Sequence, residues 1–112
     1  MYIKLQGEKI PILYCNTFMK RLIGMAFKKE IQNAIYCFPK CSSIHTFFMF
    51  QNIDVIMTDK RNHILYIYEN IKPNHIIFPK KDVYYTYELS HNSAILDIVK
   101  NNNEMDIRKK ED

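Results

Sequence analysis

The chain has few of the residues that characterise several common classes of protein. Its 112 residues include no tryptophan and only two glycines. Its apolar runs are far shorter than the roughly 20 residues with which a helix crosses a bilayer. The first residues, Met1–Leu5, alternate in polarity and lack the apolar region of a signal peptide. We therefore expect a cytoplasmic protein with no membrane partner.

Cysteine is also scarce, and positive charge is dispersed along the chain. An odd number of cysteines, three, argues against a disulfide framework in a protein expected in the cytoplasm. The formal net charge is +4, and the lysines and arginines occur as short pairs and triplets, several beside acids. A nucleic-acid-binding protein usually carries a denser basic face. We therefore expect no nucleic-acid partner, and the sequence does not determine the oligomeric state.

What the chain has in abundance is strand-forming residues. Hydrophobic residues make up 47% of the sequence and aromatic residues 13%, a composition that favours strands. The length fits one domain of roughly 100–150 residues. We predict a single domain over 1–112, with an N-terminal hairpin over 1–15, a core over about 17–107 and a charged tail over 109–112.

The pattern of polarity along the chain predicts many short strands. Two segments, 18–27 and 94–100, have helical periodicity instead and follow residues that cap helices. Segment 70–81 contains two prolines and is predicted as a loop. The predicted fold class is mainly β, an antiparallel β-sandwich or barrel-like domain with two short helices. Its strands are expected over 2–5, 9–15, 34–38, 44–50, 53–58, 63–69, 83–89 and 105–108.

Several short motifs occur in an order that resembles a known family. They are Arg21-Leu22-Ile23-Gly24-Met25, Pro39-x-Cys41-x-Ser43-Ile44-His45-Thr46, Ile53-Asp54-Val55 and Glu88-Leu89. Together they resemble domain-of-unknown-function family 192, a bacterial and archaeal family, from about Thr17 to Ile107. The resemblance implies a mainly β, sandwich-like domain with short helices. It implies no particular activity, because none is established for that family.

The chain departs from the family pattern at several turns. Phe48 stands where the family usually has glycine, and Asn52 where it usually has proline. The family commonly has Ala-Gly after the Glu88-Leu89 element, whereas this chain has Ser90-His91-Asn92. These departures affect loop geometry more than the overall fold. We interpret Ser90-His91-Asn92 and Pro73-Asn74-His75 as ordinary loops.

Polar side chains within apolar strands mark the candidate site. His45, Thr46 and Asp54 need hydrogen-bond partners if they are buried. In a structural interpretation, Asp54 pairs with Arg21 and ties the first predicted helix to the sheet. In a functional interpretation, the polar groups line a ligand pocket with aromatic walls from Phe47, Tyr66 and Tyr84. The candidate residues are His45, Thr46, Asp54, Arg21, Cys41 and Glu88.

Cys41 and His45 also allow a catalytic interpretation, with a thiol nucleophile and an imidazole base. Asp54 or Glu88 would then orient the imidazole. Four residues of extended chain separate the two Cα atoms by roughly 13 Å, unless a turn over Ser42-Ser43 shortens that distance. No nucleophile elbow accompanies the pair.

Cys37, Cys41 and His45 recur every four residues, a spacing that would line one face of a helix. Pro39 and the strand-forming neighbours disfavour a helix there. A closed zinc site also needs further ligands, and the remaining cysteine and histidines have no matching spacing. We therefore predict no metal and no cofactor.

The sequence predicts a non-catalytic protein that binds a small ligand or a protein partner through the region from His45 to Asp54. The alternative is a thiol-dependent or metal-assisted enzyme that uses Cys41 and His45. A third possibility is an interaction module that adds a partner's strand to an exposed sheet edge. The tyrosine-rich strands would also suit a surface on which sugars or the bases of single-stranded nucleic acid stack. Tyrosines in sheets are more often simply half-buried.

Overall fold

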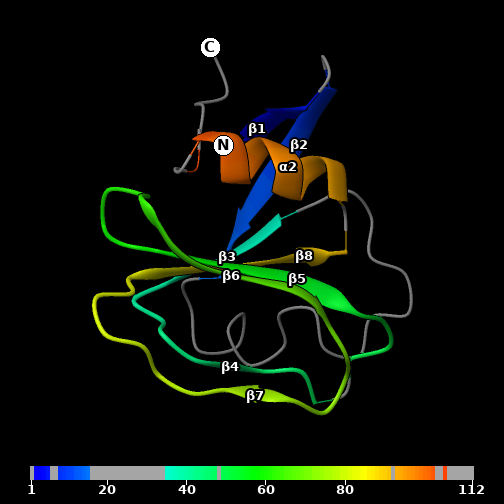
Figure 1. Cartoon of the computed structure of the whole chain (residues 1–112), viewed down its shortest axis with the longest axis vertical. Coiled ribbons are helices and arrows are strands. Elements are labelled where there is room, and N and C mark those ends of the chain that lie inside the picture. Colours follow the sequence, from blue (N-terminus) through cyan, green and yellow to red (C-terminus); the bar gives the residue numbers. More distant parts are fainter. Residues whose placement is uncertain are drawn as a thin grey trace.

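The computed structural model describes residues 2–5, 8–15, 35–47, 49–91, 93–102 and 105. The elements are β1 (Tyr2–Leu5), β2 (Glu8–Tyr14), β3 (Ile35–Pro39), β4 (Ile44–His45), β5 (Ile53–Thr58), β6 (Ile64–Ile71), β7 (Ile76–Ile77), β8 (Tyr85–Ser90) and α2 (Ser93–Asn102). Six strands form one sheet in the order β1-β2-β3-β8-β5-β6, and β4 and β7 form a second, small sheet (Figure 1). The prediction of a mainly β molecule is confirmed.

The expectation of an entirely antiparallel sheet is wrong, because β2 and β3 run parallel. Residues 15–34 separate these two strands, and a parallel connection needs a dozen or more residues. The N-terminal hairpin is confirmed as the antiparallel pair β1–β2. Among the described strands, β1 and β6 lie at opposite ends of the sheet order and do not pair, so no barrel closes.

Within the described residues there is one helix, α2, rather than the two short helices expected. It covers the predicted segment 94–100 and begins at Ser93, one residue earlier. The other predicted helix, 18–27, lies outside the described residues, as does Arg21. No helix among the described residues is long and apolar enough to cross a membrane.

The second sheet differs most from expectation. The predicted strand over 44–50 ends at His45, because the Thr46 carbonyl accepts hydrogen bonds from the amides of Asn74 at 3.0 Å and Met49 at 3.3 Å. Its partner β7 lies within the segment predicted as a loop. Pro73 and Pro79 flank β7, and these prolines hide a short β-branched strand from a pattern-based prediction.

The larger sheet separates two apolar clusters. All six residues of β5 are buried, and alternate side chains point to opposite faces. Ile56 packs on the face covered by α2, together with Leu96 and Val99. Val55 packs on the opposite face, together with residues from β4 and β7. We call these the α2 face and the β4–β7 face; Figure 1 has α2 on one side of the sheet and β4 and β7 on the other.

Candidate functional site

Asp54 is fully buried on the α2 face of β5. Its cross-strand neighbour Leu89 belongs to the cluster on that face. The ladder between β5 and β6 contains an irregularity between Ile53 and Val55, and Asn70 opposite it has a positive φ of 55°. A bulge frees a backbone N–H from the ladder, and the Asn70 amide donates to Asp54 Oδ1 at 2.8 Å.

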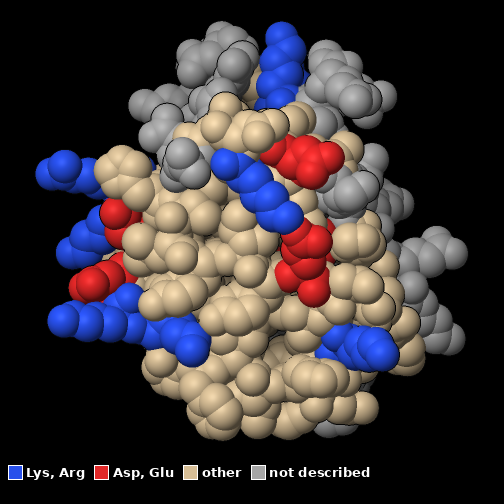
Figure 2. All heavy atoms as spheres, in the orientation of Figure 1, with Lys and Arg blue, Asp and Glu red and all other residues tan. Residues whose placement is uncertain are grey.

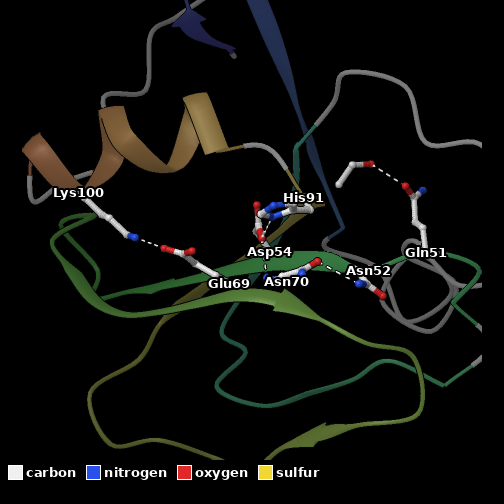
Figure 3. Close-up of polar contacts among 8 residues, drawn as sticks. Gln51, Asn52, Asp54, Glu69, Asn70, His91 and Lys100 are labelled. Atoms are coloured by element: carbon white, nitrogen blue, oxygen red, sulfur yellow. Dashed lines mark hydrogen bonds and ion pairs between the residues drawn. The ribbon is translucent and has the colours of Figure 1, made fainter.

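His91 supplies a second partner for the same carboxylate. Its Nδ1 lies 2.8 Å from Asp54 Oδ1, and 42% of its side chain is exposed. Figure 3 shows the two side chains meeting on the α2 side of β5. With Nδ1 donating to the carboxylate, the imidazole is held by its inner nitrogen. The pair therefore joins the end of β8 to β5 just before α2 begins.

Two further hydrogen bonds surround this pair. Asn52 Nδ2 donates to Asn70 Oδ1 at 3.0 Å, and Ser90 Oγ donates to Gln51 Oε1 at 3.3 Å. These contacts link the residues at the start of β5 to the ends of β6 and β8 (Figure 3). A histidine oriented by a carboxylate resembles many metal-bound histidines. Among the described residues, however, no group of three or more ligating side chains is placed to hold a metal ion.

Glu88 lies on the other face of the sheet. Its cross-strand neighbours are Tyr36 and Val55, and both belong to the cluster on the β4–β7 face. The residue is 4% exposed, and no described group offers its Oε1 a hydrogen bond. Burial raises the pKa of the Glu88 carboxyl to about 8. Most of this carboxyl is therefore neutral at pH 7.

Thr46 is buried, and its hydrogen bonds join two segments of the backbone. It is 1% exposed, its hydroxyl donates to the Lys72 carbonyl at 2.8 Å, and the same oxygen accepts from the His75 amide at 2.8 Å. Its own amide donates to the His75 carbonyl at 2.8 Å. These bonds fasten the turn before β7 to the end of β4.

The side chains of Cys41 and His45 form separate hydrogen bonds. Cys41 Sγ donates to the Ser43 carbonyl at 3.0 Å. His45 is exposed, its Nδ1 accepts from the Phe47 amide at 3.3 Å, and its ring stacks on Phe47 with centroids 5.1 Å apart. Within the described residues no hydrogen bond joins the thiol to the imidazole.

Cys37, the first residue of the four-residue spacing that also includes Cys41 and His45, is fully buried in β3. Burial, with a smaller contribution from Cys15, raises the pKa of its thiol to about 12, although a hydrogen bond with Tyr87 opposes the increase. A thiol in such surroundings is chemically inert.

The structure therefore divides the residues that the sequence grouped together. Asp54 faces α2, whereas Glu88 faces β4 and β7 from the other side of the sheet. Cys41, His45 and Thr46 lie along the segment that enters and leaves β4. In the described part of the chain Asp54 and His45 lie on different sides of the larger sheet's β4–β7 cluster, and whether any of these residues binds a ligand stays a prediction.

An open groove lies beside the small sheet instead. It has a volume of about 330 Å³. Its most exposed apolar members are Phe78 at 69%, Ile76 at 50% and Phe47 at 37%. In Figure 2 the lower part of the molecule, around β4 and β7, carries few charged side chains. The lining residues are Ser43, Ile44, His45, Phe47, Ile76, Ile77, Phe78 and Pro79.

The sequence interpretation missed two of these features. The sequence pattern predicts an ordinary loop at His91, and the departure of this segment from the family pattern is the signal that it differs. Ile76 and Phe78 lay within the predicted loop over 70–81. Their exposure depends on how β7 pairs with β4, which no local pattern reveals.

The comparisons with known proteins agree with the resemblance. The model of the DUF192 family, described as Uncharacterized ACR, matches residues 1–107. The UPF0127 protein PH1112 of Pyrococcus horikoshii is 34% identical over 87 residues, which are 74% of this chain and 72% of that protein.

Two crystal structures resemble the fold at low sequence identity. A protein of unknown function from Novosphingobium aromaticivorans has a TM-score of 0.65 at 14% identity; the match covers 76% of this chain and 66%, slightly less than two thirds, of that one. A candidate transcription regulator from Sinorhizobium meliloti has a TM-score of 0.66 at 15% identity, covering 78% of this chain and 72% of that one. At these identities the likeness concerns the fold alone.

Proposed function

The chain belongs to the DUF192 family, whose function is uncharacterised, and we propose that it is a non-catalytic binding protein that takes a small apolar ligand in the groove beside β4 and β7. The observation that carries this proposal is the group of exposed apolar side chains around that groove. Phe78, Ile76 and Phe47 all leave large apolar surfaces in water. Contiguous exposed apolar surface is typical of binding sites.

The size and chemistry of the groove support a small ligand. Its volume of about 330 Å³ lies at the lower end of the roughly 300–1,000 Å³ range of ligand sites. Such sites combine apolar walls with a few polar groups that orient the ligand. Here Ser43 and His45 are the polar members among six apolar ones.

His45 supplies a defined donor at the rim. Because its Nδ1 accepts a hydrogen bond from the Phe47 amide, the neutral ring carries its proton on Nε2. That N–H is available to a carbonyl or ether oxygen on the ligand. This role keeps His45 in the binding interpretation and leaves Asp54 out of it. A cytoplasmic location, in keeping with the three free cysteines, is part of the same proposal.

The test is binding of an apolar fluorescent probe, 8-anilinonaphthalene-1-sulfonate, to the folded protein. We expect fluorescence enhancement with the wild type and its reduction by about fivefold in Phe78→Ser, since that substitution removes the most exposed apolar wall. Leu13→Ser is the matched control, because Leu13 is an exposed apolar residue on β2, at 46%, outside the groove. Melting temperatures measured alongside would confirm that both variants are folded.

Equal loss of fluorescence in the two variants would contradict the proposal, because the probe would then report exposed apolar surface in general. With the site established, a thermal-shift screen of metabolites on wild type and Phe78→Ser would identify the ligand. A stabilising compound should lose its effect in the variant.

A further inference from the structure

A second and larger groove lies at another place on the molecule. Its volume is about 590 Å³. It is bounded by the turn between β5 and β6, by the start of β6 and by the segment just before β8. The residues that line it are Asp59, Lys60, Arg61, Leu65, Asp82, Val83 and Tyr84.

The rim of this groove carries two cationic side chains, Lys60 and Arg61. Lys60 and Arg61 are both exposed on the turn. Among the described residues, no carboxylate lies within ion-pair distance of either side chain. In Figure 2, lysine and arginine side chains project from the left edge of the molecule, where Figure 1 places this turn and the segment before β8. The cations of the rim are therefore available to an anion.

Asp59, which also lines the groove, is occupied by its own turn. Its Oδ1 accepts from the amides of Arg61 at 2.8 Å and His63 at 3.0 Å, and its Oδ2 lies 3.1 Å from His63 Nδ1. Partial desolvation raises the pKa of Asp59, but these hydrogen bonds more than offset it and leave the pKa below its ordinary value. The groove is therefore lined by two carboxylates, Asp59 and Asp82, as well as by the two cations Lys60 and Arg61; Asp59 is held by its own turn, and Asp82 has no hydrogen-bond partner among the described residues.

The floor of the groove is apolar and aromatic. Leu65 is 39% exposed, and Val83 and Tyr84 are half-buried. The Tyr84 ring packs edge-on against Tyr85 with centroids 4.7 Å apart, which fixes its orientation. Lys60 Nζ lies 5.4 Å from the centre of the Tyr84 ring. A cation is thus held directly over an aromatic floor.

We propose that this groove binds a small ligand that joins a phosphate to a flat aromatic body, a nucleoside monophosphate being the simplest member of that class. A phosphate monoester carries about −1.5 to −2 charge at pH 7, and Lys60 and Arg61, neither of which has a carboxylate partner among the described residues, are the groups that would contact it. The planar fork of Arg61 suits two phosphate oxygens. The flat base covers Leu65 and lies beside the Tyr84 ring, because Lys60 already lies over one face of that ring. This site is separate from the groove beside β4 and β7.

The experiment is an amide NMR titration of the full chain with adenosine 5′-monophosphate, and with adenosine and inorganic phosphate as separate probes. We expect saturable shifts at Lys60, Arg61 and Tyr84 with the nucleotide, and affinity about tenfold weaker for either fragment. Arg61→Glu should weaken nucleotide binding by about tenfold or more.

Lys9→Glu is the matched control. Lys9 Nζ also lies over a tyrosine ring, that of Tyr2 at 4.8 Å, and the substitution changes the net charge equally. It should leave the affinity within about twofold. The proposal is overturned if about 5 mM nucleotide gives no saturable shifts, if either fragment binds as tightly as the nucleotide, or if Lys9→Glu and Arg61→Glu weaken binding alike.

Discussion

Two buried acids on neighbouring strands, on opposite faces of one sheet, have different surroundings. Asp54 faces α2 and accepts hydrogen bonds from the Asn70 amide and from His91. Glu88 faces β4 and β7, and no described group reaches its Oε1. Burial raises the pKa of the Glu88 carboxyl to about 8. The α2 face thus supplies hydrogen-bond donors to its buried acid, whereas burial on the β4–β7 face favours a neutral Glu88.

The two faces of the same sheet differ in whether hydrogen-bond donors lie near a buried acid. On the α2 face, a bulge in β6 and the loop after β8 bring donors to the buried carboxylate. On the β4–β7 face, the cross-strand neighbours of Glu88 are Tyr36 and Val55, in an apolar cluster. Burial without donors penalises the charged form. Three substitutions test this comparison.

Glu88→Gln should have the largest effect, and it should depend on pH. Folded wild type keeps the Glu88 proton up to about pH 8, whereas the unfolded chain loses it near the ordinary value of about 4.3. Folding therefore takes up a proton between these values, and wild-type stability falls as pH rises, by about 1.4 kcal/mol per unit. Glutamine does not titrate. Relative to wild type, the free energy of unfolding of the variant should therefore increase by on the order of 4 kcal/mol between pH 5 and about pH 8.

Urea unfolding of both proteins across this pH range measures the difference. Glu69→Gln is the control: it removes an exposed ion pair with Lys100, which contributes about 0.2–1 kcal/mol, and its profile should otherwise follow the shape of the wild-type profile. Parallel profiles of wild type and Glu88→Gln would show that Glu88 is ionised in the folded protein, and the two faces would then not differ as described.

Asp54→Ala should come second, with a loss of about 3 kcal/mol in the free energy of unfolding. The substitution removes the buried acceptor of the Asn70 amide and of His91 Nδ1. Thermal or urea denaturation at pH 7 measures the loss, and Asp97→Ala, on the exposed side of α2, should cost much less. A loss below about 1 kcal/mol would mean that the carboxylate gains little from its donors.

His91→Ala should have the smallest effect, about 1.5 kcal/mol, because Asp54 keeps the Asn70 amide as a donor. His63→Ala is the matched control: it removes a similar contact between imidazole and carboxylate, at 3.1 Å from Asp59, but with both side chains partly exposed at 53% and 32%. Exposed pairs contribute about 0.2–1 kcal/mol. Equal losses in the two variants, measured by urea unfolding, would show that burial of Asp54 does not strengthen its bond to His91.

The sequence pattern located the elements with regular periodicity. Strand β5 occupies the predicted range 53–58, and α2 covers the predicted helix over 94–100. The pattern failed where pairing partners rather than periodicity make a strand. β7 has two residues between two prolines, and it exists because β4 pairs with it. The parallel pairing of β2 with β3 likewise depends on the path of the chain between them.

The structure shows where the residues of the candidate site lie, and their role in binding stays a prediction. His45 does lie beside an apolar groove, but its partners there are Ile76 and Phe78 rather than Asp54. Asp54 is indeed hydrogen-bonded, as a buried acid requires, and His91 is a partner that the sequence did not suggest. The ion pair expected with Arg21 falls outside the described residues.

The sequence by itself determined the class of fold, the family and the burial of most strands, because alternating apolar residues can be satisfied only by a covered sheet. The tertiary structure alone decided which polar groups meet. Asp54 and Glu88 both stand in strands of the same apolar character, and among the described residues the bulge at Asn70 and the course of the chain at His91 bring donors to Asp54. Long-range pairing places those donors, and no local pattern encodes it.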